Sequence, residues 1–166
     1  MSFRIVNAVA LSGALGLGGC FHARPEVTIS TPITTAELAP YKRPGAATVV
    51  GRGVLKRERS GNVTCKGQQV LLTPAVAYNR QTVAAIRAGQ KPVAGENVGS
   101  TQPYWRKAVC DAQGRFRFHN VPAAAWYVSI PVSWPDEPRE GALIQEVRVP
   151  RAGTVNVLLT ERDVIR

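Results

Sequence analysis

The chain has 166 residues, of which 45% are hydrophobic, and its 21 Lys and Arg against 11 Asp and Glu give a net charge of +10. This length suits one domain with a short extension, and a globular part of roughly 120 residues buries about two-thirds of its unfolded surface, so folding requires no metal. We expect no membrane-spanning segment after the first 19 residues, because the longest later stretch without Asp, Glu, Lys or Arg, residues 118–135, contains three prolines.

Residues 1–19 have the pattern of a signal peptide. Arg4 supplies a positive charge, Ile5 to Leu17 carry none, and the small Gly18 and Gly19 suit a cleavage site. The apolar stretch is shorter than the ~20 residues that a membrane-spanning helix needs. The pattern therefore predicts export of everything that follows.

The stretch Leu17-Gly18-Gly19-Cys20 resembles the lipobox of bacterial lipoproteins. In that family the leader is cut before the cysteine, which then carries lipid, palmitate included, on its sulfur and its amino group. Several acyl chains hold a protein stably on a bilayer, whereas one binds only marginally. Phe21 stands where inner-membrane lipoproteins often carry Asp, so the resemblance implies a lipid anchor on Cys20 in the outer membrane, facing the periplasm. The alternative is an ordinary secretory signal with Cys20 there by chance.

The predicted export of the protein limits the partners that its basic charge could attract. In the cytosol this charge would favour nucleic acid, whose phosphates supply most non-specific affinity, but an exported protein has no nucleic acid as partner. The partners that remain are anionic lipid headgroups, lipopolysaccharide phosphates or an acidic face of another envelope protein. Charge that only solvates the surface is the alternative.

The two remaining cysteines, Cys65 and Cys110, predict one disulfide, because an oxidising compartment favours such bridges. Closing a loop of that size removes on the order of 4 kcal/mol of unfolded-chain entropy. Neither cysteine lies in a Cys-x-x-Cys motif or beside a metal-type cluster, which disfavours a redox or metal role. Two buried free thiols are the alternative.

Residues 20–45 comprise the predicted lipid site and a proline-rich segment. Pro25, Pro32, Pro40 and Pro44 lie among small and polar residues with little periodicity. Prolines keep a chain extended, so this segment is predicted to be a tether that holds the folded part away from the bilayer. The alternative for residues 27–33 is an edge strand. The folded domain is predicted to span residues 46–166.

Seven short runs in that domain have the composition and alternation of strands, separated by Gly, Pro, Asn and Asp. They are residues 48–55, 69–73, 105–110, 115–118, 126–132, 143–149 and 155–159. Each run has one apolar face, and no helices alternate with them. The pattern therefore predicts an all-β fold in which seven antiparallel strands form a sandwich of two sheets.

One short helix interrupts the predicted strands. Asn79 is a suitable N-cap, Val83 and Ile86 are spaced to face the core, and Gly89 can end the helix. The loop that follows, residues 90–104, is long enough for a functional role.

The stretch from Asp111 to Trp126 resembles the recurring motif of the carboxypeptidase regulatory-like domain, a transthyretin-like (prealbumin-like) β-sandwich. Asp111 and Gly114 suit a hairpin turn, because Asp accepts backbone hydrogen bonds and Gly tolerates positive φ. An alternating Arg-Phe-Arg-Phe strand and a Val-Pro turn follow. The chain departs from the family at Ala124, where the family usually has Gly, and at Trp126, where it usually has Tyr. The resemblance implies an accessory or interaction module.

Two enzyme branches of similar folds are disfavoured by their motifs. The hydroxyisourate hydrolases end in Tyr-Arg-Gly-Ser, whereas this chain ends in Asp-Val-Ile-Arg. Intradiol dioxygenases hold iron with two Tyr and two His, but His22 lies next to the lipid site and His119 is the single histidine of the folded part. No nucleophile-elbow motif or phosphate-binding loop occurs. The sequence predicts no catalytic residue, no metal and no cofactor.

Aromatic side chains in two predicted loops are candidate contact residues. Trp134 lies in the proline-framed loop of residues 133–141, and Tyr104 and Trp105 lie at the end of the loop of residues 90–104. Aromatic rings carry much interface energy, and they stack on sugars in glycan-binding modules. The alternative for Trp134 is a ring that folds back over the sandwich.

Basic clusters are the second set of candidates. Lys56 and Arg57 lie at a strand end, and Arg115 and Arg117 share the solvent face of one strand. If such residues converge, they form a surface for an anionic partner. Scattered charge that protects strand edges is the alternative.

These observations predict a non-enzymatic outer-membrane lipoprotein that acts as a structural or interaction module of the cell envelope. A subunit of a secretion apparatus is one specific form, because outer-membrane lipoproteins of the type VI secretion apparatus also use a transthyretin-like sandwich. The alternative is a module that binds a glycan or another small ligand at the outer membrane.

Overall fold

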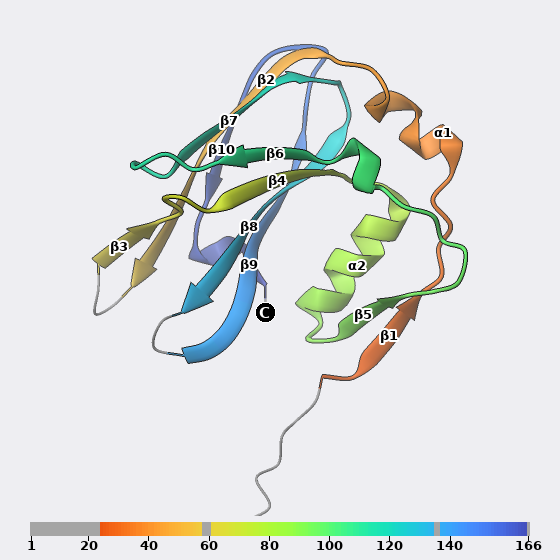
Figure 1. The fold of residues 1–166 in the computed structure, drawn as a ribbon, viewed down its shortest axis with the longest axis horizontal. Coiled ribbons are helices and arrows are strands. Elements are labelled where there is room, and N and C mark those ends of the chain that lie inside the picture. The colour runs from red at the N-terminus through yellow and green to blue at the C-terminus, as the bar shows by residue number, and fades with distance from the viewer. Residues whose placement is uncertain (1–23, 58–60, 135–136, 166) are drawn as a thin grey trace, which may run out of the picture.

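The computed structural model describes residues 24–57, 61–134 and 137–165. The predicted signal peptide and Cys20 lie outside these residues. Strands dominate the described chain, and two sheets pack face to face with helix α2 on one side (Figure 1). The strands are β1 (Glu26–Ile29), β2 (Ala46–Arg57), β3 (Gly61–Thr64), β4 (Gln69–Pro74), β5 (Lys91–Ala94), β6 (Arg106–Val109), β7 (Arg115–Val121), β8 (Ala125–Trp134), β9 (Glu137–Arg148), β10 (Ala152–Leu159) and β11 (Val164–Ile165).

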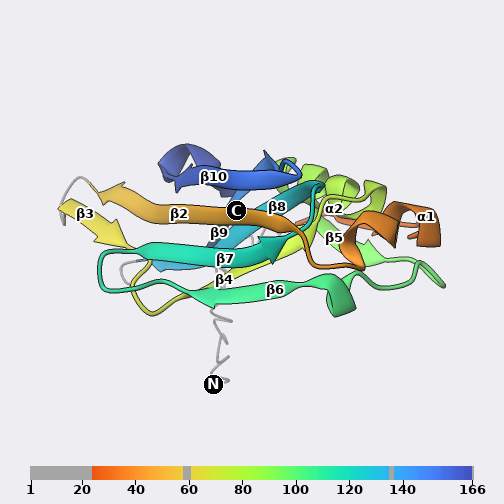
Figure 2. The same ribbon diagram turned by 90° about the horizontal axis from the view of Figure 1, so that it is seen from above.

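The first sheet is built on the long strand β2. Strand β10 pairs with one edge of β2 in parallel, while β7 and then β3 pair antiparallel with its other edge. The second sheet has the order β11-β9-β8-β4-β6 and is antiparallel throughout. Strands β1 and β5 form a separate parallel pair. Figure 2 shows β10, β2 and β7 side by side in the first sheet.

The core lies between the two main sheets. Alternate residues of each strand point into it, as the period of two requires. In β7, for example, Phe116 and Phe118 are buried, whereas Arg115 and Arg117 are exposed. The largest fully buried side chains are Trp126, Leu72, Ile130, Leu159 and Val49.

All seven predicted runs coincide with strands, which confirms an all-β, sandwich-like fold. The described residues nevertheless hold eleven strands rather than seven, because β1, β3, β5 and β11 are too short to give a clear alternation. The sheets are also not purely antiparallel. After β9 the chain crosses to the first sheet, and β10 runs in the same direction as β2.

The predicted helix is confirmed as α2 (Ala77–Arg87), which ends before Gly89 with its φ of 73°. Its N-cap is Val76, not Asn79. The Asn79 side chain instead donates to the carbonyl of Pro74 and to Oγ1 of Thr101, tying the helix to neighbouring segments.

The two predicted loops contain regular structure. Residues 90–104 include β5 and the 3₁₀ turn η2 (Gln102–Tyr104). Residues 133–141 lie largely in a hairpin, because β8 continues to Trp134 and β9 begins at Glu137. The cross-strand pairing of β8 and β9 extends the sheet further than the prolines of this segment indicate.

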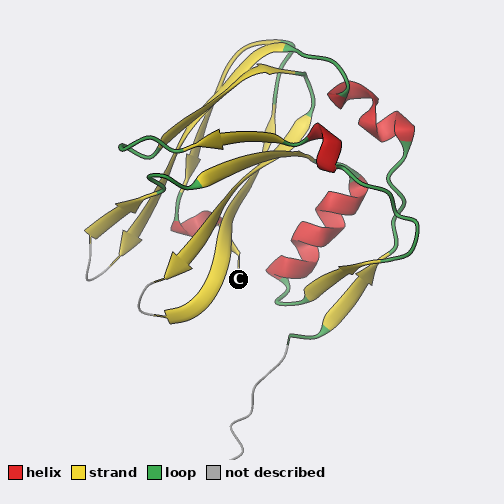
Figure 3. Ribbon diagram, viewed as in Figure 1, coloured by secondary structure: helices red, strands yellow, loops and turns green. Residues whose placement is uncertain are grey.

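The described part of the predicted tether, residues 24–45, is folded, which corrects the sequence-based prediction. It forms β1, a second helix α1 (Thr35–Leu38) and the 3₁₀ turn η1 (Ala39–Tyr41) (Figure 3). Tyr41 is 9% exposed, its ring packs edge-on against Trp126 with centroids 4.7 Å apart, and its hydroxyl donates to the carbonyl of Ala125 at 2.7 Å. The folded unit therefore begins well before residue 46.

Glu37 joins this segment to helix α2. Its Oε1 accepts a hydrogen bond from the backbone N–H of Ala77, the first residue of α2, at 3.1 Å. Its Oε2 accepts from the backbone of Thr34, completing a capping box on α1. A carboxylate at a helix N-terminus also interacts favourably with the helix dipole. The backbone hydrogen bonds, above all that from Ala77, lower the pKa of Glu37 below its usual 4.5.

A second carboxylate fastens α2 to the second sheet. Arg80 of α2 lies 2.8 Å from Glu146 of β9, and both side chains are partly exposed. This hydrogen bond from Arg80 is the main reason that the pKa of Glu146 is lowered. Val83 of α2 and Tyr127 of β8 belong to one small buried hydrophobic cluster, against which Ile144 of β9 packs. Helix α2 therefore covers the outer face of the second sheet, at β8 and β9.

These two carboxylates make the docking of α1 and α2 sensitive to acid. Both carboxylates have a pKa that is lower in the folded protein than the value of 4.5 in the unfolded chain. Their contribution to the free energy of unfolding is therefore fully present above pH 4.5, and it is lost as the pH falls through the pKa of each group in the folded protein. We expect the melting temperature to fall between pH 6 and pH 3. Glu37→Gln, which removes one titration, should show a shallower fall by differential scanning calorimetry. Glu96→Gln, at an exposed loop position, is the matched control. Identical pH profiles for Glu37→Gln and the wild type would contradict this role.

Candidate anion-binding groove

A shallow groove of about 820 Å³ lies on the first sheet. Its lining residues come from β2, β7, β10 and the neighbouring β6: Val50, Gly51, Arg52, Lys107, Ala108, Val109, Asp111, Arg115, Phe116, Arg117, Asn156 and Val157. We call this surface the basic groove. It combines strands from both main sheets, since β6 belongs to the second.

Strand register places the arginines of the groove together. Arg52 of β2 is directly opposite Arg115 of β7, and Val50 is opposite Arg117. All three arginines are exposed, so they lie on the outer face of the sheet. Like charges directly across a strand pair are destabilising, and no aspartate or glutamate of β2, β7 or β10 offsets them. Asn156 of β10 lies opposite Val50 on the other side and adds a polar group.

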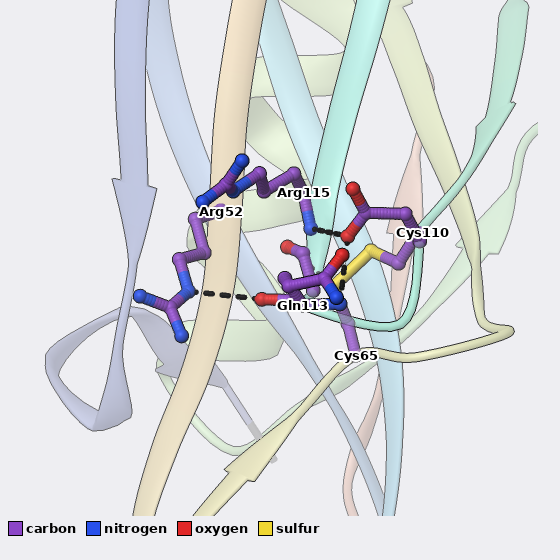
Figure 4. The surroundings of a disulfide bond; sticks show 7 residues. Arg52, Cys65, Cys110, Gln113 and Arg115 are labelled. Atoms are coloured by element: carbon purple, nitrogen blue, oxygen red, sulfur yellow. Dashed lines mark hydrogen bonds between the residues drawn. A yellow bond between two sulfur atoms is a disulfide. The ribbon is translucent and has the colours of Figure 1, made fainter.

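A tight turn forms one end of the groove (Figure 4). The carboxylate Oδ1 of Asp111 accepts hydrogen bonds from the backbone N–H groups of Gln113, at 2.9 Å, and Arg115, at 2.7 Å. Gly114 has a φ of 74°, which a residue without Cβ adopts freely. Arg52 Nε donates to the carbonyl of Gln113 at 3.0 Å, so this guanidinium is held against the turn.

The predicted disulfide between Cys65 and Cys110 is confirmed. Both cysteines are buried, and Cys110 immediately precedes the Asp111 turn. Cys65 follows β3, so the bridge joins the end of β6 to the segment that leads into β4 (Figure 4). It therefore fixes the position of the turn that borders the basic groove.

The electrostatics of the groove are one-sided. Four cationic side chains line it, those of Arg52, Lys107, Arg115 and Arg117, against the single carboxylate of Asp111. That carboxylate already accepts two backbone hydrogen bonds within its own turn. The lining is completed by small and aliphatic residues, and its one aromatic ring, Phe116, is only 4% exposed. This arrangement can bind an anion, but it offers no ring on which a sugar could stack.

Gly51 of β2 packs directly against the ring of Phe116 below the groove. A Cβ on Gly51 would lie 2.2 Å from Cζ of Phe116, closer than any carbon contact allows. Glycine at this position therefore lets the Phe116 ring fill the core directly beneath β2. As a result, no side chain projects between Arg52 and Val50 on the inner side of the strand.

The structure brings together some of the predicted contact residues and separates others. Arg115 and Arg117 line the basic groove, whereas Lys56 is exposed near the end of β2, outside the groove lining. The side chains of Arg57 and Trp134 lie outside the described residues. Lys107, Arg52 and Asn156 complete the groove. Alternation along β2 puts Arg52 on the face opposite the buried Val49 and Leu55, but only the strand order reveals its neighbours.

The predicted aromatic platform is not assembled among the described residues. Tyr104 is half-buried and packs against the main core. Trp105 is 38% exposed, and its Nε1 donates to Oγ1 of the buried Thr101 at 3.0 Å. Trp126 is fully buried. Neither Tyr104 nor Trp105 lines the basic groove.

Within residues 24–57, 61–134 and 137–165, no three His, Cys, Asp or Glu side chains gather as metal ligands. His119 is exposed on β7. In the same part of the chain, no helix has the length and apolar character needed to span a membrane.

The fold and groove define an all-β sandwich with a basic outer face. A candidate carbohydrate-binding protein from Pseudomonas aeruginosa has a similar structure, with a TM-score of 0.62, 23% identity, and coverage of 78% of this chain and 97% of that one. The minor pilin of Streptococcus agalactiae matches more weakly, with a TM-score of 0.40, 9% identity, and coverage of 71% of this chain and 44% of the pilin. The first match shows a shared fold, and the second carries no argument. No protein-family profile and no curated protein matches the chain.

Proposed function

We propose that this protein is a non-enzymatic envelope lipoprotein, anchored in the outer membrane through Cys20, whose basic groove binds a phosphate-bearing or otherwise anionic glycan of the envelope. The observation that carries the proposal is the clustering of Arg52, Lys107, Arg115 and Arg117 around one groove. Like charges are held together here at a cost in stability, and a bound polyanion would offset that cost.

The fold match supports a glycan as the ligand class, since the protein from Pseudomonas aeruginosa that shares the fold is described as a candidate carbohydrate-binding protein. The cationic side chains of the groove favour a glycan that is anionic. Its lining has no exposed aromatic ring for stacking on a neutral sugar, whereas guanidinium groups bind phosphate and carboxylate through charge-assisted hydrogen bonds.

The sandwich belongs, in this proposal, to the transthyretin-like type and to the carboxypeptidase regulatory-like domains. Two features of the resemblance support this. Asp111 and Gly114 make the hairpin turn that the motif implies, with the hydrogen bonds and positive φ that suit those residues. Trp126, which replaces the family's usual Tyr, fills the centre of the core, and its Nε1 donates to the carbonyl of Pro122.

Binding is tested with purified lipopolysaccharide and with the same material after removal of its phosphates. We expect Arg115→Ala/Arg117→Ala to bind lipopolysaccharide at least tenfold more weakly than the wild type, with a weaker dependence on salt. Lys42→Ala/Arg43→Ala is the matched control, because it removes the same charge from exposed residues outside the groove. Equal losses in both double variants, or wild-type binding that does not weaken as the salt concentration rises, would refute an anion-specific groove, whereas binding that survives dephosphorylation would assign the recognised anion to carboxylates.

The anchor is tested separately by palmitate labelling in cells. The wild-type protein should incorporate labelled palmitate and sediment with outer membranes, while Cys20→Ala should do neither. Labelling that persists in Cys20→Ala would disprove the lipid site without affecting the groove.

An envelope protein partner, as in a secretion apparatus, is the second candidate function. The observation that favours it is the uncharged free edge of β10, which lies on the same sheet as the groove.

A further inference from the structure

Strand β10 leaves one long edge of the first sheet open. It pairs with β2 over eight residues, from Ala152 to Leu159, and no strand of the described residues pairs with its other edge. In a parallel strand, alternate residues direct their N–H and C=O groups to each side. The outer edge of β10 therefore presents a row of backbone donors and acceptors that no described strand satisfies.

This edge lacks the features with which proteins usually prevent strand addition. Its sequence, Ala-Gly-Thr-Val-Asn-Val-Leu-Leu, contains no charge and no proline, and its register with β2 is continuous, without a bulge. Charged side chains, prolines, bulges and short length are the common forms of edge protection.

The other edge strands of the described chain do have such protection. Strand β6 carries Arg106 and Lys107, and β7 carries Arg115 and Arg117. Strands β3 and β11 have only four and two residues. The β1–β5 pair is four residues long and contains charged residues and a proline. The protein thus protects its other edges and leaves β10 open.

The side chains of β10 are also suited to receiving a strand. Val157 and Leu159 point into the core and are 5% and 0% exposed, which holds the strand rigidly in place. On the outer face Leu158 is 59% exposed, although it is a large apolar residue. An added strand would cover part of it while extending the ladder.

The positive charge around the β10 edge favours an acidic segment as the added strand. Leu158 of β10 lies opposite Arg52 of β2, and Arg151 is exposed just before the strand begins. The whole chain has a net charge of +10, which opposes edge-to-edge pairing of two copies. An extended segment with carboxylates on its outer face would instead be attracted to this edge.

We propose that the free edge of β10 is a docking site for an extended, acidic segment of another envelope protein, which adds to the first sheet as a further strand. Backbone hydrogen bonds supply the affinity in this mode of recognition, and alternate side chains supply the specificity. Asn156 and Val157 of β10 also line the basic groove, so the test must change the backbone pairing of the added strand and leave the groove side chains unaltered.

The probe is a synthetic ten-residue peptide in which Asp and Thr alternate with Val, titrated into the full-length protein in detergent micelles. Two N-methylated forms are compared with it, one methylated on the Val amides and the other on the Asp and Thr amides. Only one of these sets can face β10. We expect one N-methylated peptide to bind at least tenfold more weakly while the other binds as the parent does, and a Lys-for-Asp peptide to bind at least tenfold more weakly.

Hydrogen exchange locates the peptide. The parent peptide should slow exchange at alternate amides of β10 by at least tenfold. Equal binding of the two N-methylated peptides, or protection confined to the groove, would show electrostatic attachment and overturn the proposal. If the β10 amides exchange slowly without peptide and the protein sediments as a dimer, the edge binds a second copy of this chain, which would also overturn the proposal.

Discussion

Removal of the disulfide by Cys65→Ala/Cys110→Ala is expected to lower the free energy of unfolding by about 4 kcal/mol, because the bridge closes a loop across a separation of 45 residues. For a domain of this size the melting temperature should fall by about 10–20 °C. Urea denaturation and scanning calorimetry of the oxidised proteins measure both quantities. The effect is large because the core of a small sandwich leaves only a modest net stability.

The matched control is the wild-type protein under a reducing agent, which should unfold at the same urea concentration as the double variant. The reducing agent should leave the double variant unchanged. We also expect loss of affinity in the basic groove of the variant, because Cys110 fixes the turn beside Arg115. A double variant as stable as the oxidised wild type would contradict a structural role for the bridge.

Tyr41→Ala is expected to destabilise the protein by about 3–5 kcal/mol, the range for removing a large buried aromatic side chain. Its ring packs edge-on against the fully buried Trp126, and its hydroxyl donates to the carbonyl of Ala125. Hydrogen exchange should also accelerate in α1 and at the start of α2, since the segment around Glu37 depends on this contact. Equilibrium denaturation and exchange measurements together provide the test.

Tyr41→Phe separates packing from hydrogen bonding. It keeps the ring and removes the hydroxyl, so it should cost about 1 kcal/mol, or somewhat more because the Ala125 carbonyl loses a partner. If Tyr41→Ala unfolded at the wild-type urea concentration, residues 24–45 would be a tether after all, as their prolines indicate.

The fold was largely predictable because its strands carry clear local signals. The alternation in β7 and β8 identifies both strands and their buried faces, and Asp111 and Gly114 identify the turn between β6 and β7. The parallel pairing of β10 with β2 was not predictable in this way. Strand direction depends on where the chain crosses between sheets, and periodicity carries no information about that.

In the N-terminal segment, composition alone predicts the wrong structure. Its prolines favour an extended tether, but Tyr41 and Leu38 are anchored by tertiary contacts with the core. The four residues of α1 could not form a stable helix alone, and Glu37 stabilises both α1 and α2. Such contacts between distant segments override local propensity.

The basic groove was only half predictable. Arg115 and Arg117 are recognisable as one exposed face of a strand, but their proximity to Arg52 and Lys107 depends on strand order and on the approach of β6. These four cations lie in three segments, and nothing in their local sequence links them. The surroundings of the candidate aromatic residues also depend on tertiary contacts, because Tyr104 packs against the core and Trp105 bonds to Thr101.

If the protein is lipid-anchored as proposed, the docking of residues 24–45 limits how far its folded part can lie from the membrane. With lipid on Cys20, as proposed, only five residues lie between the anchor and Glu26, and even a fully extended chain spans about 20 Å from Cys20 to Glu26. The layers then follow in the order β1–β5, α2, second sheet and first sheet (Figure 1). Of these layers, the first sheet lies farthest from β1 (Figure 1). The groove and the β10 edge, which both belong to that sheet, would therefore be open to a glycan or a protein segment in the periplasmic space.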